Sequence, residues 1–200
     1  MVDDRELAAI AGDTYVAAPT WRAGDVHALF TLRRGLRIVA VRGTTADPAD
    51  WLRDLSAMPA HDPDIGLCHA GFLAGARALA AQVASSRADL CGAVLTGHSM
   101  GGAIAILLAG LLRARGTWLR AVVTFGAPRC GSWTLRRALR DLPLRLYRNG
   151  DDPVPDVPWV PALYLHPRKL IAIGQPALDP IADHHIAAYR RALAPGMETD

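Results

Sequence analysis

The sequence predicts an α/β fold in which a mostly parallel β-sheet is covered by helices on both faces. Short apolar runs alternate with longer helical runs, a rhythm typical of parallel strands joined by crossover helices. The strand runs are Leu36 to Val41, Ala93 to Thr96 and Leu119 to Phe125. Because they are apolar at nearly every position, we expect these strands to be buried on both faces.

Length and composition fit one domain spanning residues 1–200. Of the 200 residues, 51% are hydrophobic and 20% charged, which suffices for a sizeable core. The net charge is only +3 and the arginines are scattered, so we expect no nucleic-acid partner. This charge allows a weak contact with an anionic membrane or micelle surface.

The N-terminus, MVDDRE, lacks the basic start and apolar core of a signal peptide. The longest apolar run, Ala103 to Leu112, is roughly half as long as the ~20 residues that a membrane-spanning helix needs. We therefore expect a cytoplasmic protein. Its three cysteines, Cys68, Cys91 and Cys130, show no metal-ligand spacing and are most simply free thiols, with one bridge still allowed.

The first third of the chain is predicted to hold one helix and two strands. Apolar residues recur at helical spacing between Asp3 and Tyr15, which indicates an amphipathic helix packed on the sheet. No residue there suggests chemistry. Val26 to Leu32 alternates as an edge strand does, and a turn leads from it into Leu36 to Val41.

The stretch Ala46 to Pro63 has two equally supported interpretations. Trp51, Leu52 and Leu55 fall on one side of a short helix, which would either cover a binding site or pack on the core. An alanine-rich helix is then expected over Gly71 to Ser86, and it leads to the next strand.

The C-terminal half is expected to continue the alternation. A helix over Ser132 to Leu142 precedes strands over Leu144 to Arg148 and Leu170 to Ile173, and Ile186 to Leu193 forms a closing helix. The proline-rich segment Pro153 to Pro167 cannot hold a regular helix, so we expect it to wrap the surface near the strand ends.

A turn of sequence GHSMG, residues 97–101, separates the strand Ala93 to Thr96 from a helix starting near Gly102. A G-x-S-x-G turn between a strand and a helix is the nucleophile elbow of α/β-hydrolases, which exposes the serine hydroxyl at the sheet edge. Ser99 is therefore the candidate nucleophile. Its alternative role is that of a helix N-cap.

A serine hydroxyl needs a general base to take its proton and an acid to orient that base. In α/β-hydrolases the acid and then the histidine follow the serine in the chain. Asp152, in the loop after a predicted strand, and His184, in the loop before the closing helix, fit this order. Asp151 and His185 are the neighbouring alternatives.

Seven motifs follow one another: VRGTT at 41–45, DWLRDL at 50–55, HAGF at 69–72, LTGHSMGGAIA at 95–105, TFGAPR at 124–129, RNGDDPVPDVP at 148–158 and DHHIAAY at 183–189. In this order and spacing they resemble the class 3 lipases, the fungal-lipase-like branch of the α/β-hydrolases. The resemblance runs from about Val39 onward. It implies an α/β-hydrolase fold and a Ser-His-Asp triad.

Carried over by motif, the resemblance makes Ser99 the nucleophile. The family's N-x-x-D-x-V-P pattern selects Asp152 over Asp151, and its D-H-x-I-x-x-Y ending selects His184 over His185 as the base. His98, inside the elbow, resembles the family's usual residue there and is expected to be structural.

The resemblance also implies an oxyanion hole made of two backbone N–H groups. One is that of Met100, directly after the nucleophile at the positive end of a helix. The other is that of Thr44, helped by its hydroxyl, and Gly43 would let that backbone approach closely. The reaction requires no metal and no organic cofactor.

The segment after the R-G-T motif departs from the family, whose well-known members carry a discrete amphipathic lid there and are longer, often secreted and disulfide-bridged. Residues 45–57 are short and have only Trp51, Leu52 and Leu55 as large apolar side chains. We therefore predict a compact, weakly lidded site that prefers soluble short- or medium-chain acyl esters.

The sequence thus predicts a serine carboxylic ester hydrolase, a lipase or esterase that forms an acyl-enzyme on a small-molecule or lipid ester. Two alternatives use the same triad: acyl transfer to an alcohol or thiol, and thioester hydrolysis. A non-catalytic ligand-binding module is the alternative outside enzymes.

Overall fold

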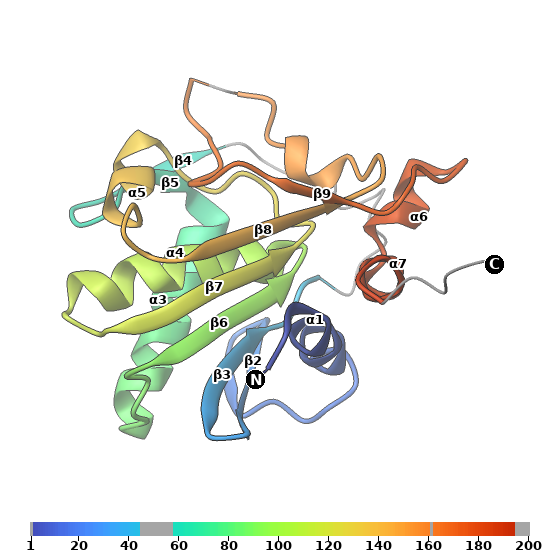
Figure 1. The fold of residues 1–200 in the computed structure, drawn as a ribbon. Helices are drawn as coiled ribbons and strands as arrows, with labels where there is room; N and C mark the ends of the chain where they lie inside the picture. The colour runs from blue at the N-terminus through green and yellow to red at the C-terminus, as the bar shows by residue number, and fades with distance from the viewer. Residues whose placement is uncertain (1, 45–57, 161, 195–200) are drawn as a thin grey trace.

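The computed structural model describes residues 2–44, 58–160 and 162–194 (Figure 1). The main sheet consists of β1 (Trp21–Ala23), β2 (Val26–Arg33), β3 (Leu36–Val41), β6 (Ala93–His98), β7 (Leu119–Phe125), β8 (Leu144–Asn149) and β9 (Ile171–Ile173). The seven strands lie in that same order across the sheet. β1, β2 and β3 are antiparallel, whereas every pair from β3 to β9 is parallel.

The helices are α1 (Asp4–Asp13), α3 (Ala70–Ser86), α4 (Met100–Ala114), α5 (Trp133–Ala138), α6 (Pro180–His184) and α7 (Ile186–Ala192), with a 3-10 turn η1 (Val154–Asp156). Figure 1 shows α3 and α4 on one face of the sheet and α1 and α7 on the other. The predicted α/β architecture, with helices on both faces, is therefore confirmed.

The two faces of the sheet bury separate apolar clusters, because successive side chains of a strand point to opposite faces. Val39, Val41 and Leu95 pack with residues of α3 and α4. Ile38 and Val94 pack with residues of α1 and α7. This double burial explains why the central strands read as continuous apolar runs.

The elbow helix α4 is the most deeply buried helix segment of this core. Every residue from Gly101 to Leu112 is buried, in agreement with the rule that a helix apolar on all sides lies inside the protein. Truncating one of its leucines, such as Leu107, to alanine would cost about 2–5 kcal/mol of stability. The strand-turn-helix unit is thus held rigidly from both sides.

Local capping explains where two helices begin. The Asp3 carboxylate accepts a hydrogen bond of 2.8 Å from the backbone N–H of Glu6 and starts α1 at Asp4. The His69 side chain occupies the same position at α3 and stacks on Phe72, with ring centroids 4.0 Å apart. The HAGF motif therefore has a structural role at a helix start.

Several boundaries differ from the sequence prediction. A hairpin of β4 (Pro59–Asp62) and β5 (Gly66–His69) and the short strand β1 were not predicted, because these segments carry few β-branched residues and no clear alternation. The predicted helix over Ser132 to Leu142 ends at Ala138. The chain continues as a turn, and Leu139 and Leu142 of this turn are buried in the core.

The sequence suggested that the proline-rich segment Pro153 to Pro167 wraps the surface, but part of this segment is buried. It contains η1 and no longer helix among its described residues. Val154 and Tyr164 are fully buried, and Leu165 forms an isolated bridge with Gly131. The segment therefore packs into the end of the sheet where the parallel strands finish.

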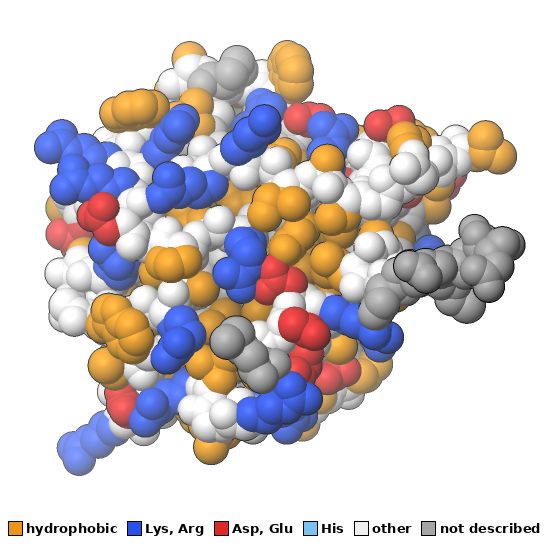
Figure 2. Space-filling model, viewed as in Figure 1, with side chains coloured by type: hydrophobic (Ala, Val, Ile, Leu, Met, Phe, Trp, Pro, Cys, Tyr) orange, Lys and Arg blue, Asp and Glu red, His pale blue; other side chains and the backbone are white. Residues whose placement is uncertain are grey.

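Positive charge is dispersed over the surface. On the face in Figure 2, lysine and arginine side chains are interspersed with apolar and acidic ones. Trp118, Trp133 and Trp159 are exposed, and an arginine lies over each ring. Within the described part of the chain, no helix is long and apolar enough to cross a bilayer.

Candidate active site

The residues with chemical potential gather where the parallel strands end. Val41 of β3 pairs with Gly97 of β6, so the loops that follow these strands leave the sheet side by side. The loops after β7 and β8 leave the same edge, because all four strands are parallel. Ligand sites of open α/β sheets lie at this carboxyl edge.

Ser99 forms the sharp turn between β6 and α4. Its backbone has φ 56° and ψ −134°, a strained conformation for a residue with a side chain, of the kind that clusters at functional sites. Ser99 occupies the N-cap position, but its hydroxyl makes no capping hydrogen bond. The N-cap alternative therefore does not account for this side chain. α4 begins at Met100, two residues before the predicted start, directly after this turn.

Glycines beside Ser99 make the turn sterically feasible. A Cβ atom on Gly97 would lie 2.5 Å from the carbonyl carbon of Gly101, and one on Gly101 would overlap the carbonyl oxygen of Val41. The helix therefore starts in direct contact with the strand that precedes it and with the end of β3. Only glycine permits this approach of two backbones.

Three buried side chains form one hydrogen-bonded chain. The Ser99 hydroxyl oxygen lies 2.9 Å from Nε2 of His184, and Nδ1 of His184 lies 2.9 Å from Oδ2 of Asp152. A carboxylate only accepts, so Nδ1 donates to Asp152 and Nε2 accepts from Ser99. The three residues are at most 2% exposed. This arrangement fits a Ser-His-Asp triad.

The two neighbouring candidates point elsewhere. Asp151 is exposed, and its backbone N–H donates to the Asp183 carboxylate at 2.9 Å. His185 is also exposed and starts α7 as its N-cap. The structure thus brings Asp152 and His184 to the serine and leaves their sequence neighbours outside. His184 itself ends the short helix α6, where the sequence predicted a loop.

Asp152 is held by two further donors. The backbone N–H of Val154 donates to Oδ1 at 2.9 Å, and the hydroxyl of Tyr189 donates to Oδ2 at 2.5 Å. Burial, together with the adjacent Asp152 carboxylate, raises the pKa of Tyr189 well above its ordinary value. Tyr189 therefore remains a proton donor to the carboxylate. It lies in the DHHIAAY motif, but sequence reasoning assigned it no role.

The chain leaving β7 at Gly126 lies directly against Asp152 and His184. Gly126 has φ +62°, and a Cβ atom there would lie 2.7 Å from Oδ2 of Asp152 and 3.0 Å from Nδ1 of His184. Any side chain at this position would push the two groups apart. The glycine of the TFGAPR motif thus makes room for the hydrogen bond between them.

Asp183 ties the loop that carries Asp152 to the segment that carries His184. Its carboxylate accepts from the backbone N–H groups of Asp151 at 2.9 Å and Ala177 at 3.0 Å. The side-chain amide of Asn149 donates to the Asp183 carbonyl at 3.1 Å. Asn149 lies in the same motif as Asp152, and Asp183 lies in the same motif as His184. Their role in holding these two segments together was not predicted from the sequence and is inferred from the hydrogen bonds.

A second set of polar contacts lies behind the serine. Nδ1 of His98 is 2.8 Å from the Tyr15 hydroxyl, and Nε2 of His98 is 2.6 Å from the His184 carbonyl oxygen. Both ring nitrogens of His98 are thus engaged by groups other than the Ser99 hydroxyl, which agrees with a structural role. Sequence reasoning missed Tyr15, since a single tyrosine at the end of a helix carries no pattern.

The predicted oxyanion donors are the backbone N–H groups of Met100, next to Ser99 in the chain, and of Thr44, next to Gly43. Met100 is the first residue of α4, where helix N–H groups lack intrahelical partners. A Cβ atom on Gly43 would lie 3.3 Å from that of Ser99, so the peptide leading to Thr44 runs against the serine. Trp51, Leu52 and Leu55, the predicted lid residues, lie outside the described residues.

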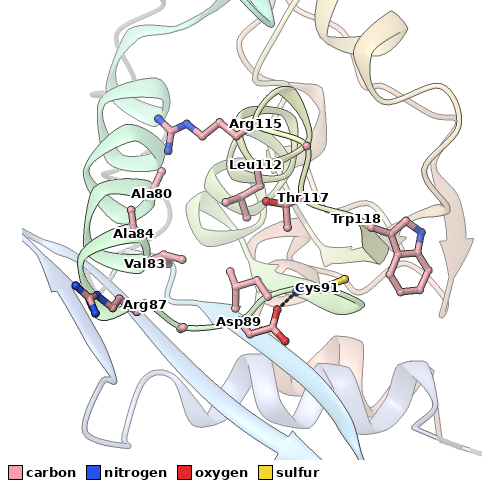
Figure 3. Close-up of a pocket in the computed structure, with 13 residues that line it drawn as sticks. Ala80, Val83, Ala84, Arg87, Asp89, Cys91, Leu112, Arg115, Thr117 and Trp118 are labelled. Atoms are coloured by element: carbon pink, nitrogen blue, oxygen red, sulfur yellow. Dashed lines mark hydrogen bonds between the residues drawn. The ribbon is translucent and has the colours of Figure 1, made fainter.

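A cavity of about 470 Å³ lies at the opposite end of the sheet (Figure 3). It is formed by the C-terminal ends of α3 and α4 and the chain entering β6, and its lining includes Leu112, Arg115 and Trp118. Among the residues that line it, no nucleophile is hydrogen-bonded to a base. The arrangement around Ser99 therefore decides the location of the candidate active site.

Cysteines and metal ligands contribute little to this site. Cys68 and Cys130 are buried free thiols and Cys91 is an exposed one. Burial raises the pKa of Cys68 to about 12 and that of Cys130 well above its ordinary value, so both stay protonated. In the described ranges, no three His, Cys, Asp or Glu side chains group as metal ligands would.

Comparison with known proteins gives a family and a fold. The family described as lipase (class 3) matches residues 38–161. Secreted mono- and diacylglycerol lipase 1 of Fusarium solani is 32% identical over 139 residues, which cover 64% of this chain and 41% of that protein. The chain therefore matches less than half the length of this relative. That relative is described as secreted, so the comparison does not support the predicted cytoplasmic location.

Solved structures of fungal lipases share the fold. The Rhizomucor miehei lipase in a propeptide complex superposes with a TM-score of 0.65 at 23% identity, over 86% of this chain and 64% of that one. A nonglycosylated Yarrowia lipolytica lipase gives 0.65 at 18% identity, over 85% and 78%. These likenesses confirm the predicted α/β-hydrolase fold.

Proposed function

The chain belongs to the class 3 lipase family, and from that premise we propose that it is a carboxylic ester hydrolase that works through a serine acyl-enzyme. The observation that carries the proposal is the buried chain of hydrogen bonds from Ser99 through His184 to Asp152. A serine hydroxyl is a weak nucleophile, and a positioned imidazole is what activates it.

In the acylation step, the Ser99 hydroxyl oxygen attacks the ester carbonyl carbon and its proton passes to Nε2 of His184. The carbonyl electron pair moves onto oxygen, and the C–O bond to the alcohol then breaks. The departing alkoxide takes the proton from His184 and leaves as an alcohol. Asp152 keeps the imidazole oriented and stabilises its positive charge while it holds the proton.

In the deacylation step, His184 takes a proton from water, and the resulting hydroxide attacks the acyl carbon. The bond to Ser99 breaks and the serine oxygen regains the proton, which releases the carboxylic acid. Both steps pass through an oxyanion. We propose that the backbone N–H groups of Met100 and Thr44 donate to it, each contributing ~3 kcal/mol to the transition state.

The proposed substrates are soluble short- or medium-chain acyl esters. The proposal is supported by the small number of large apolar side chains in segment 45–57. The Fusarium relative is named for mono- and diacylglycerols, so partial glycerides of such chains are the natural second series. The predicted weak contact with a micelle surface is tested with the same substrates.

The deciding experiment measures hydrolysis of p-nitrophenyl esters from C2 to C16, with and without micelles, by the wild-type chain and by Ser99→Ala. We expect activity at C4 to C10, weak dependence on micelles, and loss of more than ~1,000-fold in the variant. A fluorophosphonate probe should label the wild type at Ser99 only. Strong activation by micelles with C16 would overturn the substrate proposal, and full activity of Ser99→Ala would overturn the mechanism.

A further inference from the structure

Tyr15 connects the N-terminal region of the chain to the candidate active site. It lies in the turn after α1, far in sequence from its partners. Its hydroxyl is 2.8 Å from Nδ1 of His98, whose Nε2 is 2.6 Å from the carbonyl oxygen of His184. His98 also packs against the ring of His184, with centroids 4.7 Å apart.

The partners determine the direction of these hydrogen bonds. A carbonyl oxygen only accepts, so Nε2 of His98 carries the proton. Burial and the neighbouring His184 hold the pKa of His98 well below its ordinary value, so the ring is neutral and Nδ1 is an acceptor. The Tyr15 hydroxyl must therefore donate to it. Burial raises the pKa of Tyr15 to about 12, which keeps this proton in place.

The other side of Tyr15 meets the end of β3. A side chain on Gly43 would overlap the Tyr15 hydroxyl, so the Gly43 backbone lies directly against that oxygen. Gly43 precedes Thr44, the proposed oxyanion donor. A chain of hydrogen bonds therefore runs from Tyr15 through His98 to the main chain of His184, and its Tyr15 end packs against Gly43.

We propose that Tyr15 is a positioning residue. Through its contact with Gly43 and its hydrogen bond to His98, it sets the distance between the backbone at Thr44, the proposed oxyanion donor, and the backbone of His184, the proposed base. Tyr15 touches neither the Ser99 hydroxyl nor the imidazole nitrogens of His184 in the described contacts. It acts on the two backbones that carry the reacting groups. The inference rests on the proposed function, because it assigns a role within that same site.

The test compares Tyr15→Phe with Tyr147→Phe. The Tyr147 hydroxyl donates to the Asp4 carboxylate at 2.5 Å, so both variants lose one partly buried hydrogen bond. Small misplacements of reacting groups reduce kcat more than KM. We expect Tyr15→Phe to lower kcat about 10- to 100-fold with KM changed less than about 2-fold. Tyr147→Phe should keep the wild-type kcat while losing stability.

A second readout does not depend on ester hydrolysis. The rate at which a fluorophosphonate labels Ser99 should fall in Tyr15→Phe in parallel with kcat and stay unchanged in Tyr147→Phe. If the wild type is labelled but cleaves no ester, the proposed function fails while this rate still tests Tyr15. Wild-type rates in Tyr15→Phe, or equal losses in both variants, would overturn the inference.

A measurement on the wild-type protein covers the case in which Tyr15→Phe does not fold. The ¹⁵N spectrum of the histidine rings, with the His98 signals identified by loss in His98→Gln, reports which nitrogen carries the proton. The inference requires a neutral His98 protonated at Nε2. A ring protonated at Nδ1 would reverse the hydrogen bond from Tyr15 and overturn it.

Discussion

The Tyr189 hydroxyl donates a 2.5 Å hydrogen bond to Oδ2 of Asp152, the same oxygen that accepts from Nδ1 of His184. This oxygen of the candidate acid therefore has a second side-chain donor besides the imidazole, and this donor comes from α7. Because α7 closely follows His184, one short C-terminal segment supplies both side chains that donate to Oδ2 of Asp152. Asp152, His184 and the closing helix α7 are thus joined by hydrogen bonds.

Tyr189→Phe removes that donor while keeping the ring. A buried charged acceptor that loses a hydrogen bond costs about 1–3 kcal/mol of stability. We also expect kcat to fall about 10-fold, because the carboxylate is less well oriented toward His184. Urea denaturation and p-nitrophenyl ester kinetics measure the two effects. An unchanged free energy of unfolding would show that the bond contributes no net stability.

Asp152→Asn and Asp151→Asn form a matched pair. An amide at position 152 cannot accept from Nδ1 of His184 with the same charge and favours the wrong tautomer, so kcat should fall ~10⁴-fold. The Asp151 side chain is exposed, and only its backbone holds Asp183. Asp151→Asn should therefore keep kcat within about 2-fold of wild type. The reverse order of effects in steady-state kinetics would make Asp151 the acid.

Gly126→Ala tests the close approach beneath the acid and base. The new Cβ atom would lie 2.7 Å from Oδ2 of Asp152, whereas one on Gly116 would meet nothing within 4 Å. Gly116→Ala is the control. Gly126 and Gly116 have positive φ, of 62° and 83°, so alanine at either position costs about 1–2 kcal/mol through the backbone. Only Gly126→Ala should also lose activity, by more than ~10-fold. Thermal unfolding and kcat separate the two contributions.

Stability should decrease as the pH falls below His98's ordinary pKa of about 6.5. Burial lowers the pKa of His98 in the folded chain, so in this range the unfolded chain binds a proton that the folded chain does not. Each pH unit then costs about 1.4 kcal/mol of unfolding free energy for this group. Burial also lowers the pKa of His166, which adds an effect of the same sign.

Urea denaturation at pH 7.5, 6.5 and 5.5 measures this dependence, and His98→Gln supplies the comparison. The variant has no titrating ring at that position, so its stability should fall less steeply below pH 6.5 than that of the wild type. If stability fell equally steeply with pH in both proteins, the folded chain would take up the His98 proton at the same pH as the unfolded chain. That result would also contradict its hydrogen bond with Tyr15.

The sequence predicted those elements whose formation depends on their own residues, and it missed those that depend on contacts with distant segments. β3 and β7 begin and end where their apolar runs predicted, because burial on both faces requires an apolar residue at nearly every position. The hairpin of β4 and β5 was not predicted, because its pairing depends on segments packed around it. His69 at its end, for example, hydrogen-bonds through its backbone to the carbonyl of Cys130.

The sequence by itself determined the fold class, the elbow at Ser99 and the family, because each is written in local periodicity or in the order of motifs. The resemblance of its motifs to the class 3 lipases also ranked Asp152 above Asp151 and His184 above His185. Only the tertiary structure decided which side chains meet: it turned Asp152 and His184 toward the serine, and it brought Tyr189 to Asp152 and Tyr15 to His98. The physical reason is that hydrogen bonds form over about 3 Å between residues far apart in the chain, and folding alone sets such distances.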